Sequence, residues 1–181
     1  MNMLPLIAQA KNNTDKVAIY SDDTSYTFND LLIQSHLLAS SLLEQTNDLK
    51  EARVAFMVNP GFKYVQALWG IWQAGGVAVP LCITHPFPSL SYVLEDTGAS
   101  VLIISKEYET LLSPFIEKSN CKTIVIDSFL ANQLQSLPEI ELSRKALILY
   151  TSGTTNKPKG VVTTHANIQA QVTTLVSAWE W

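Results

Sequence analysis

The residues with the clearest chemical potential lie between positions 150 and 160, where the sequence reads YTSGTTNKPKG. This segment combines hydroxyl side chains, glycines and lysines: Thr151, Ser152, Gly153, Thr154, Thr155, Asn156, Lys157, Lys159 and Gly160. Glycine lets a backbone turn and approach a ligand closely. Hydroxyl groups, backbone amides and ammonium groups together suit the many acceptor oxygens of an oligophosphate. The segment therefore predicts a phosphate-binding loop; the alternative is a solvated loop whose lysines only keep the chain soluble.

Charge is distributed unevenly along the chain. The formal net charge is −4 and the pI is near 5.3, which argues against a protein that coats nucleic acid with a basic surface. No Asp or Glu occurs between Glu141 and Glu180, whereas four cations do: Arg144, Lys145, Lys157 and Lys159. A cationic segment in an acidic chain favours a local anion site.

Other catalytic motifs do not match. Pro158 stands where a Walker A loop has the glycine before its lysine, and no GxGxxG occurs. Ser152 lacks the GxSxG elbow of a serine hydrolase. His165 is expected to pack at, or to cap, the start of the last helix; the alternative is that it approaches the phosphate. Trp69 and Trp72 share one apolar helix face, which indicates core packing rather than a cofactor platform.

Short β-branched runs alternate with helical patterns along the chain. A small hairpin is predicted over 17–20 and 26–28, and strands over 54–58, 77–81, 101–104, 123–126, 146–150 and 161–163. Helices are predicted over 30–45, 62–74, 89–97, 106–117 and 167–179, and one short helix followed by a connector over 128–145. Strands separated by helices indicate βαβ units, and therefore an α/β fold with a mostly parallel sheet.

Length and composition limit the class of protein. A chain of 181 residues with 47% apolar and 15% charged residues can bury one real core and is not intrinsically disordered. Cys82 and Cys121 form no CxxC or His/Cys cluster, which predicts two buried thiols in a reducing compartment rather than a zinc site. The N-terminus lacks the features of a signal peptide, and no apolar run reaches the ~18 residues that span a bilayer. We expect a cytoplasmic protein.

The run from Thr151 to Gly160 resembles the phosphate-loop signature T-S-G-T-T-G-x-P-K-G of the AMP-forming acyl-CoA synthetases, the superfamily that includes firefly luciferase and peptide-synthetase adenylation domains. Asn156 replaces the second glycine of that signature, and Asn is one of the few other residues that adopt left-handed backbone conformations. Further segments resemble the family along the whole chain: SYTFNDL at 25–31, GGVAVP at 75–80, and His85-Pro86 followed by 90–98. Pro-Leu-Cys at 80–82, His85-Pro86 and AWEW at 178–181 resemble the malonyl-CoA synthetase branch.

The resemblance implies a fold and an activity. Residues 1–181 would be a partial, N-terminal AMP-binding domain, taken from the large domain of an adenylate-forming enzyme. Such enzymes convert a carboxylic acid and MgATP to an acyl-adenylate with release of pyrophosphate, and then transfer the acyl group to coenzyme A. The resemblance implies that residues 151–155 bind the β- and γ-phosphates and that Lys159 is the charged residue of the signature. Lys157 would add only to the positive electrostatic potential around the phosphates. Most ligands of Mg²⁺, and all of the family's catalytic residues, would lie outside the chain.

Several expectations and alternatives follow from this resemblance. We expect a truncated chain that completes neither half-reaction alone, and whose exposed apolar surface favours self-association. One alternative is a non-catalytic remnant that binds a phosphate-bearing ligand. Another is part of an adenylation domain that loads a carrier protein instead of coenzyme A. The acid, malonate or a fatty acid, stays open at this point.

Overall fold

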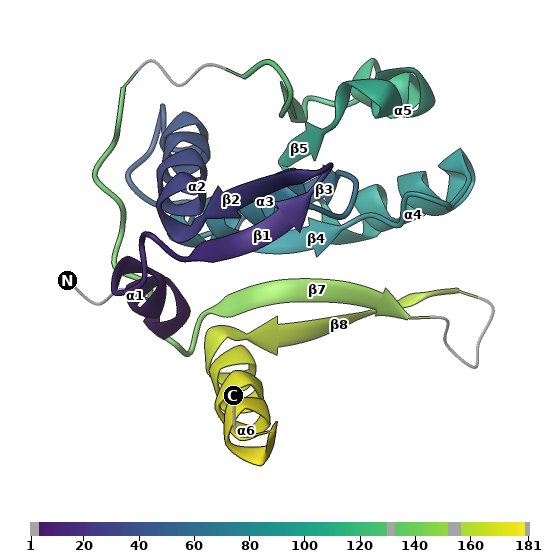
Figure 1. Ribbon diagram of the computed structural model, residues 1–181. Helices are drawn as coiled ribbons and strands as arrows, with labels where there is room; N and C mark the ends of the chain where they lie inside the picture. The colour runs from purple at the N-terminus through teal and green to yellow at the C-terminus, as the bar shows by residue number, and fades with distance from the viewer. Residues whose placement is uncertain (1–3, 130–132, 152–156, 180–181) are drawn as a thin grey trace.

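The computed structural model describes residues 4–129, 133–151 and 157–179, and they form a sheet flanked by helices on both faces (Figure 1). The strands of this sheet, in the order β6-β5-β3-β4-β7-β8, are β3 (Arg53–Met57), β4 (Val77–Pro80), β5 (Val101–Ile104), β6 (Lys122–Val125), β7 (Lys145–Thr151) and β8 (Lys159–Thr164). Neighbouring strands run parallel except β7 and β8. A separate antiparallel hairpin consists of β1 (Val17–Ser21) and β2 (Thr24–Thr27). The predicted α/β fold is confirmed, with its mostly parallel sheet and small hairpin.

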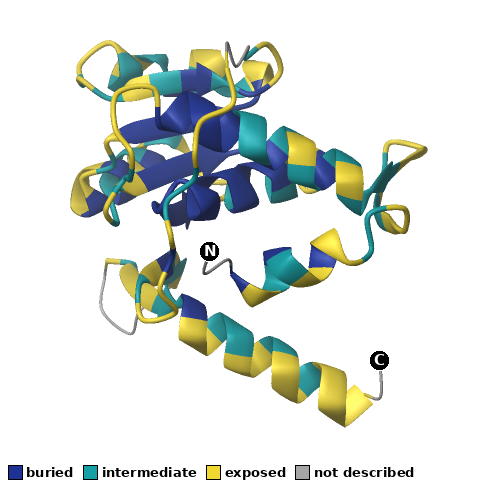
Figure 2. Cartoon of the chain, turned by 90° about the vertical axis from the view of Figure 1, so that its left-hand side faces the viewer, coloured by how far each residue is buried: buried dark blue, intermediate teal, exposed yellow. Residues whose placement is uncertain are grey.

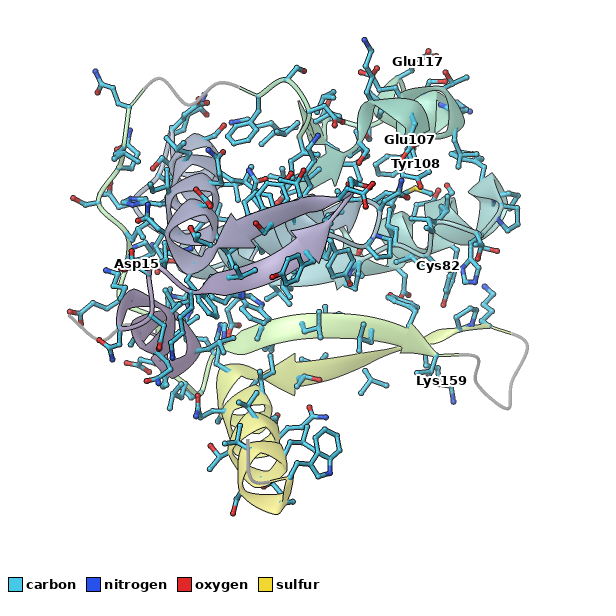
Figure 3. The ribbon with its side chains drawn as sticks, in the orientation of Figure 1. Asp15, Cys82, Glu107, Tyr108, Glu117 and Lys159 are labelled. Atoms are coloured by element: carbon cyan, nitrogen blue, oxygen red, sulfur yellow. The ribbon has the colours of Figure 1, made fainter. Side chains whose placement is uncertain are left out.

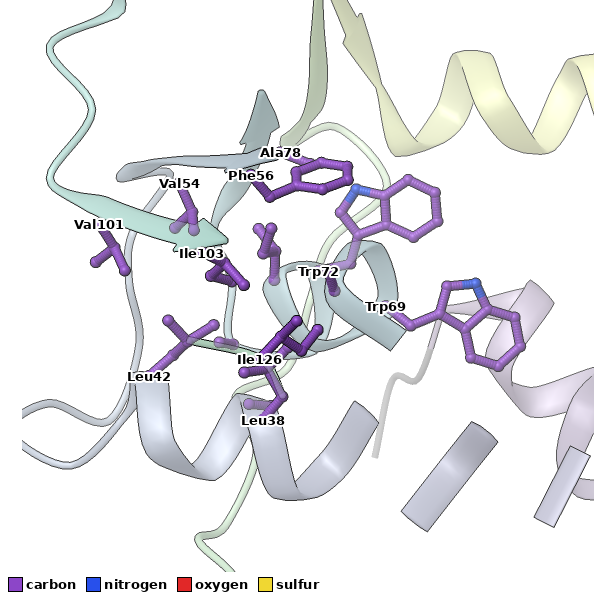
Figure 4. Close-up of a cluster of buried hydrophobic side chains, with 14 of the residues drawn as sticks. Leu38, Leu42, Val54, Phe56, Trp69, Trp72, Ala78, Val101, Ile103 and Ile126 are labelled. Carbon is purple, nitrogen blue, oxygen red and sulfur yellow. The ribbon is translucent and has the colours of Figure 1, made fainter. Parts of the chain in front are cut away.

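The helices bury the two faces of the sheet separately. They are α1 (Pro5–Lys11), α2 (Phe28–Leu42), α3 (Phe62–Gln73), α4 (Phe87–Thr97), the 3₁₀ turn η1 (Lys106–Tyr108), α5 (Glu109–Ile116) and α6 (His165–Trp179). Val54 and Phe56 of β3 pack with α2 and α3, whereas Ala55 and Met57 pack with α4 and α5. This alternation follows from the two-residue period of a strand. Figure 4 shows the first of these clusters, in which Trp72 of α3 lies beside Phe56.

The β7–β8 ribbon joins the rest of the sheet along a short hydrogen-bonded seam, although β7 lies beside β4 for more of its length. β7 pairs with β4 through a single register pair, Ala78 with Leu147. By contrast, four register pairs join β3 to β4 and another four join β3 to β5. β7 and β8 pair with each other along their whole length. They form a hairpin although their connection is longer than the 2–5 residues usual for such loops.

Helix α6 is fully buried only at its first residue and is half-buried along one side. His165 is buried, and the helix has no other buried residue (Figure 2). Its apolar side chains follow one stripe at helical spacing: Ile168, Val172, Leu175, Val176 and Trp179. Trp179 is 54% exposed and Val176 is 43% exposed. Ile168, Val172 and Leu175 of this stripe are half-buried, so the stripe is most exposed at the C-terminal end of the helix.

Two predictions from the sequence are wrong, and one helix was not predicted. Helix α1 was not predicted. Its apolar pattern is too short to give a clear signal, since only Ile7 and Ala10 are buried. Residues 133–144 contain no helix, although one was predicted within 128–145; the neighbouring 130–132 lie outside the described residues. Cys82 is exposed rather than buried, because the chain leaves the sheet at Leu81, while Cys121 is half-buried. No described helix has the length and apolar character needed to cross a membrane.

Candidate functional site

The predicted phosphate loop begins at the carboxyl end of β7, the edge of the sheet at which the parallel strands also end. Thr151 is the last residue of β7, and Lys159 is the first of β8. The two are register partners in the antiparallel ladder, so their side chains share one face. The structure thus places two residues of the predicted site opposite each other, and Figure 3 shows Lys159 at the loop end of β8. The other predicted residues Ser152, Gly153, Thr154, Thr155 and Asn156 lie outside the described residues.

Lys157 is held against helix α4. Its Nζ lies 5.6 Å from the ring centroid of Tyr92, a distance at which a cation and an aromatic face attract each other. The hydroxyl of Tyr92 donates a hydrogen bond to the carbonyl of Pro158 at 3.3 Å. The two loop lysines are therefore placed differently: Lys157 contacts α4, whereas Lys159 shares a face with Thr151.

Gly160 lies inside strand β8 rather than in a turn, and it faces Tyr150 of β7. A Cβ atom at position 160 would lie 2.9 Å from Cγ2 of Ile148 and 3.2 Å from the Tyr150 ring. Real Cβ contacts are essentially never as close as the first of these distances. The missing side chain at Gly160 thus makes room for Tyr150, and the expected freedom to turn is not used at this position.

Tyr150 links the end of β7 to α4. Its hydroxyl donates a hydrogen bond to the carboxylate of Asp96, and its ring meets the ring of Tyr92 edge to face, with centroids 6.3 Å apart. Burial raises the pKa of the Tyr150 phenol, and the Asp96 carboxylate raises it further. Sequence reasoning missed Tyr92 and Asp96. The available signal was their spacing of four residues on a helix, which places both side chains on one face.

The four cations of the basic segment separate in space. Arg144 Nη1 and Nη2 each lie 2.9 Å from a carboxylate oxygen of Asp48, and Nη2 also donates to the Gly75 carbonyl at 2.8 Å. Lys145 Nζ lies 3.4 Å from Glu51. Both residues stand at the start of β7, about 20 Å from its loop end at ~3.3 Å per residue. The prediction that four cations form one local anion site is wrong, because two of them are ion-paired at the opposite edge.

His165 is a packing residue, as expected. Its ring is buried edge-to-face on Trp72, with centroids 5.5 Å apart. Burial lowers the pKa of His165 to about 4, and the charge of Arg144 lowers it as well. The helix cap is formed instead by Thr164 and Asn167, whose side chains each accept a hydrogen bond from the other's backbone N–H. His165 follows the last residue of β8, at the end of that strand opposite Lys159 and the loop.

Two cavities lie away from the described part of the loop. The first cavity has a volume of about 490 Å³ and lies at the carboxyl ends of β3 and β5. At this point the segment after β3 and the segment after β5 lead to opposite faces of the sheet. The polar groups of this cavity are paired with one another: Lys63 with Asp127 at 2.5 Å, and Asn59 with Glu107 at 2.6 Å. A larger one of about 600 Å³ lies between α1, α2 and the segment 134–140. The described residues contain no cluster of three or more His, Cys, Asp or Glu side chains that could hold a metal ion.

Comparisons with known proteins agree on one family. A family model described as AMP-binding enzyme matches residues 6–181. The human mitochondrial malonate–CoA ligase ACSF3 is 35% identical over 188 residues, which cover 98% of this chain and 33% of that protein. The malonate–CoA ligase of Arabidopsis thaliana is 32% identical over 201 residues, covering 96% of this chain and 33% of its own length. The chain thus spans about a third of the length of the curated relatives it matches.

Solved structures show the same fold. Apo MatB from Rhodopseudomonas palustris superposes with a TM-score of 0.85 at 21% identity, covering all of this chain (100%) and 38% of that chain. The o-succinylbenzoate CoA synthetase MenE from Bacillus subtilis, solved in complex with AMP, gives a TM-score of 0.83 at 24% identity, covering 96% of this chain and 45% of that chain. The family model spans nearly the whole sequence, and the fold agrees with it. The chain therefore belongs to the AMP-binding enzymes, the adenylate-forming family that its loop sequence resembles.

Proposed function

We propose that this chain is the part of an AMP-forming carboxylate–CoA ligase that binds the phosphates of ATP, and that the ligase acts on malonate. The observation that carries the proposal is the pairing of Thr151 with Lys159 at the carboxyl end of β7. The choice of malonate is supported by relatives named malonate–CoA ligases, which match along almost the entire chain. Residues 1–181 would then form a partial, N-terminal AMP-binding domain of the enzyme.

The chemistry explains why such a loop carries a lysine. The substrate carboxylate attacks the α-phosphorus of ATP, a bond forms between the acyl oxygen and phosphorus, and the bond to the pyrophosphate oxygen breaks. Negative charge then grows on the departing pyrophosphate, and fixed donors at that position lower the barrier. Lys159 is exposed and has no ion-pair partner among the described residues, so its ammonium group is available for a phosphate oxygen. The hydroxyl of Thr151 lies on the same face.

Mg²⁺ and coenzyme A complete the proposed reaction. Mg²⁺, when bound, neutralises phosphate charge, and it commonly binds through substrate phosphates with only one or two carboxylates. The described residues offer no carboxylate cluster for it, so no step is assigned to the metal in this chain. Coenzyme A is the expected acyl acceptor, by analogy with the named relatives.

The direct test is MgATP binding to the 181-residue chain, measured by equilibrium dialysis with radiolabelled ATP. We expect Lys159→Ala to weaken binding at least tenfold, which corresponds to about 1.4 kcal/mol. Lys106→Ala is the matched control, because Lys106 is an exposed lysine after β5 and lies outside the loop. Equal binding by wild type and Lys159→Ala would contradict the assignment, as would an equal loss in the control.

A second assay addresses the alternatives. We expect no malonate-dependent ATP–pyrophosphate exchange from the chain alone, and exchange when the chain is co-expressed with the remaining two thirds of a malonate–CoA ligase. MgATP binding without exchange in that complex would favour the non-catalytic alternative. Transfer of the malonyl group to a carrier protein, but not to coenzyme A, would favour an adenylation domain.

Self-association and location are further parts of the proposal. Exposed apolar side chains follow the ribbon and α6, among them Leu149, Val161 and Val162. Large exposed apolar patches favour association, so we propose that the chain self-associates, which light scattering over a concentration series would show.

We also propose a cytoplasmic location, although the name of the human relative places that protein in mitochondria. Microscopy of a tagged chain tests this.

A further inference from the structure

We propose that Tyr92 and Asp96 of α4 are positioning residues for the phosphate loop: they hold the two flanks of the loop against one helix and thereby fix the backbone at Lys159. The role in phosphate binding rests on the proposed function above. The contacts themselves do not depend on it, because all of them lie among the described residues.

Helix α4 contacts the loop on both sides. On the incoming side, the hydroxyl of Tyr150 donates to the carboxylate of Asp96. On the outgoing side, the hydroxyl of Tyr92 donates to the carbonyl of Pro158, and its ring lies under the ammonium group of Lys157. Tyr92 and Asp96 stand one helical turn apart, so a single helix face serves both flanks. The edge-to-face contact of Tyr92 with Tyr150 joins the two contacts into one unit.

The backbone of the sheet does little to position this end of the ribbon. β7 pairs with β4 only at Ala78 and Leu147, near the start of β7 and far from the loop. On its other side β7 pairs only with β8, which is the last strand of the sheet. The position of the loop end of β7 therefore depends on side-chain contacts rather than on backbone pairing with β4. Gly160 leaves room for this arrangement, because a Cβ atom there would lie 2.9 Å from Cγ2 of Ile148 and 3.2 Å from the Tyr150 ring.

The contact at Pro158 acts directly on the residue that follows it. The carbonyl of Pro158 and the amide nitrogen of Lys159 belong to one planar peptide unit. A hydrogen bond that fixes the Pro158 carbonyl therefore also fixes the orientation of the Lys159 N–H group. Proline adds a second constraint, since its ring fixes φ at about −65°. The β7–β8 ladder places Lys159 next to Thr151, and the contacts with α4 hold this end of the ladder in place before any ligand binds.

The decisive variants are Tyr92→Phe, which removes one hydroxyl and keeps the ring, and Asp96→Asn, which removes the charge and keeps the shape. Tyr20→Phe is the matched control, because Tyr20 is 80% exposed and lies on β1 of the separate hairpin. The first readout needs no nucleotide: amide hydrogen exchange of residues 159–161, with residues 53–57 as an internal reference. The second readout is MgATP affinity, and urea unfolding reports on the stability of the whole chain.

We expect Tyr92→Phe to raise exchange at residues 159–161 about fivefold and to weaken MgATP binding by a similar factor, as loss of one hydrogen bond predicts. Exchange at residues 53–57 should be unchanged, and Tyr20→Phe should behave as wild type. The double variant Tyr92→Phe/Asp96→Asn should show more exchange than either single variant, because Tyr92→Phe removes the contact with the outgoing flank and Asp96→Asn weakens the contact with the incoming flank to a neutral hydrogen bond.

The outcomes separate this proposal from the proposed function. If wild type does not bind MgATP, the proposed function fails, while exchange still decides whether α4 holds the flanks. Unchanged exchange in both variants would overturn the proposal. So would faster exchange with unchanged MgATP affinity, because the contacts would then stabilise the fold without positioning Lys159. Equal acceleration at residues 53–57 would likewise overturn it, as the sign of a general loss of stability.

Discussion

Replacement of Asp48 by Asn tests the contact that fixes the start of β7. The carboxylate of Asp48 accepts two hydrogen bonds from Arg144, each 2.9 Å long, and the two side chains are 26% and 16% exposed. Exposed ion pairs contribute about 0–1 kcal/mol, whereas breaking a fully buried pair costs about 3–5 kcal/mol. For this partly buried, bidentate pair we expect Asp48→Asn to lower the free energy of unfolding by about 2 kcal/mol. For a chain of this length the melting temperature would fall by about 4–8 °C.

The same substitution also predicts how the stability difference depends on pH. Burial alone would raise the pKa of Asp48, but the hydrogen bonds and charge of Arg144, with a backbone hydrogen bond from Lys50, outweigh burial and lower it below the ordinary value of 3.8. A lowered folded-state pKa stabilises the protein above the unfolded pKa, and this contribution is lost as pH falls through the folded value. The difference between wild type and Asp48→Asn should therefore be full at pH 7 and disappear in strong acid.

Urea unfolding followed by circular dichroism, at pH 7 and over a series of acid pH values, measures both the loss of stability and its dependence on pH. Glu44→Gln is the control, since Glu44 pairs with Lys122 at 3.0 Å but both side chains are 45% exposed. The control should change stability by less than about 1 kcal/mol. If Asp48→Asn changes stability no more than the control does at pH 7, the reasoning from burial and geometry is refuted.

Three other substitutions or titrations test the neighbouring contacts. Gly160→Ala would place a methyl group 3.2 Å from the Tyr150 ring, so we expect a loss of about 1–3 kcal/mol in urea unfolding, whereas an unchanged midpoint would show that the ribbon adjusts freely. His165, whose pKa burial lowers to about 4, should titrate near that value by NMR. Because its folded pKa lies below the ordinary 6.5, stability should fall as pH drops from 6.5 through 4; a midpoint near 6.5 would mean that the ring is solvated. Trp72→Phe removes the donor to the Ala146 carbonyl, a bond of 2.8 Å, and should reduce stability by at least about 1–3 kcal/mol in the same unfolding assay.

Much of the fold was predictable because its signals are local. Continuous apolar runs such as 54–58 and 101–104 indicated strands buried on both faces, and the structure places them at the centre of the sheet. Gly98 ended a predicted helix and is indeed the left-handed cap of α4. The pairing of β7 with β8 was not predictable in this way. The connection between the two strands is longer than is usual for a hairpin, and their ladder forms between residues on either side of it.

The candidate site shows a similar limit. The loop sequence identified Thr151 and Lys159, and the structure makes them register partners. The sequence also suggested that Arg144 and Lys145 strengthen the same site, because a linear charge count takes no account of the length of the intervening strand. Their acceptors, Asp48 and Glu51, lie far away in the chain, and only the fold brings them together. The contacts of α4 with the loop were missed for the same reason.

The narrow seam between β4 and β7 has a consequence for how the molecule opens. Strands joined by long ladders unfold as one cooperative unit, whereas a segment attached at few points opens at lower free energy. Strands β3, β4 and β5 should act as a rigid platform, and the β7–β8 ribbon as an arm that detaches first when denaturant is added. The binding loop would then sit on the least stable part of the sheet, where small changes in side-chain anchoring shift its position most.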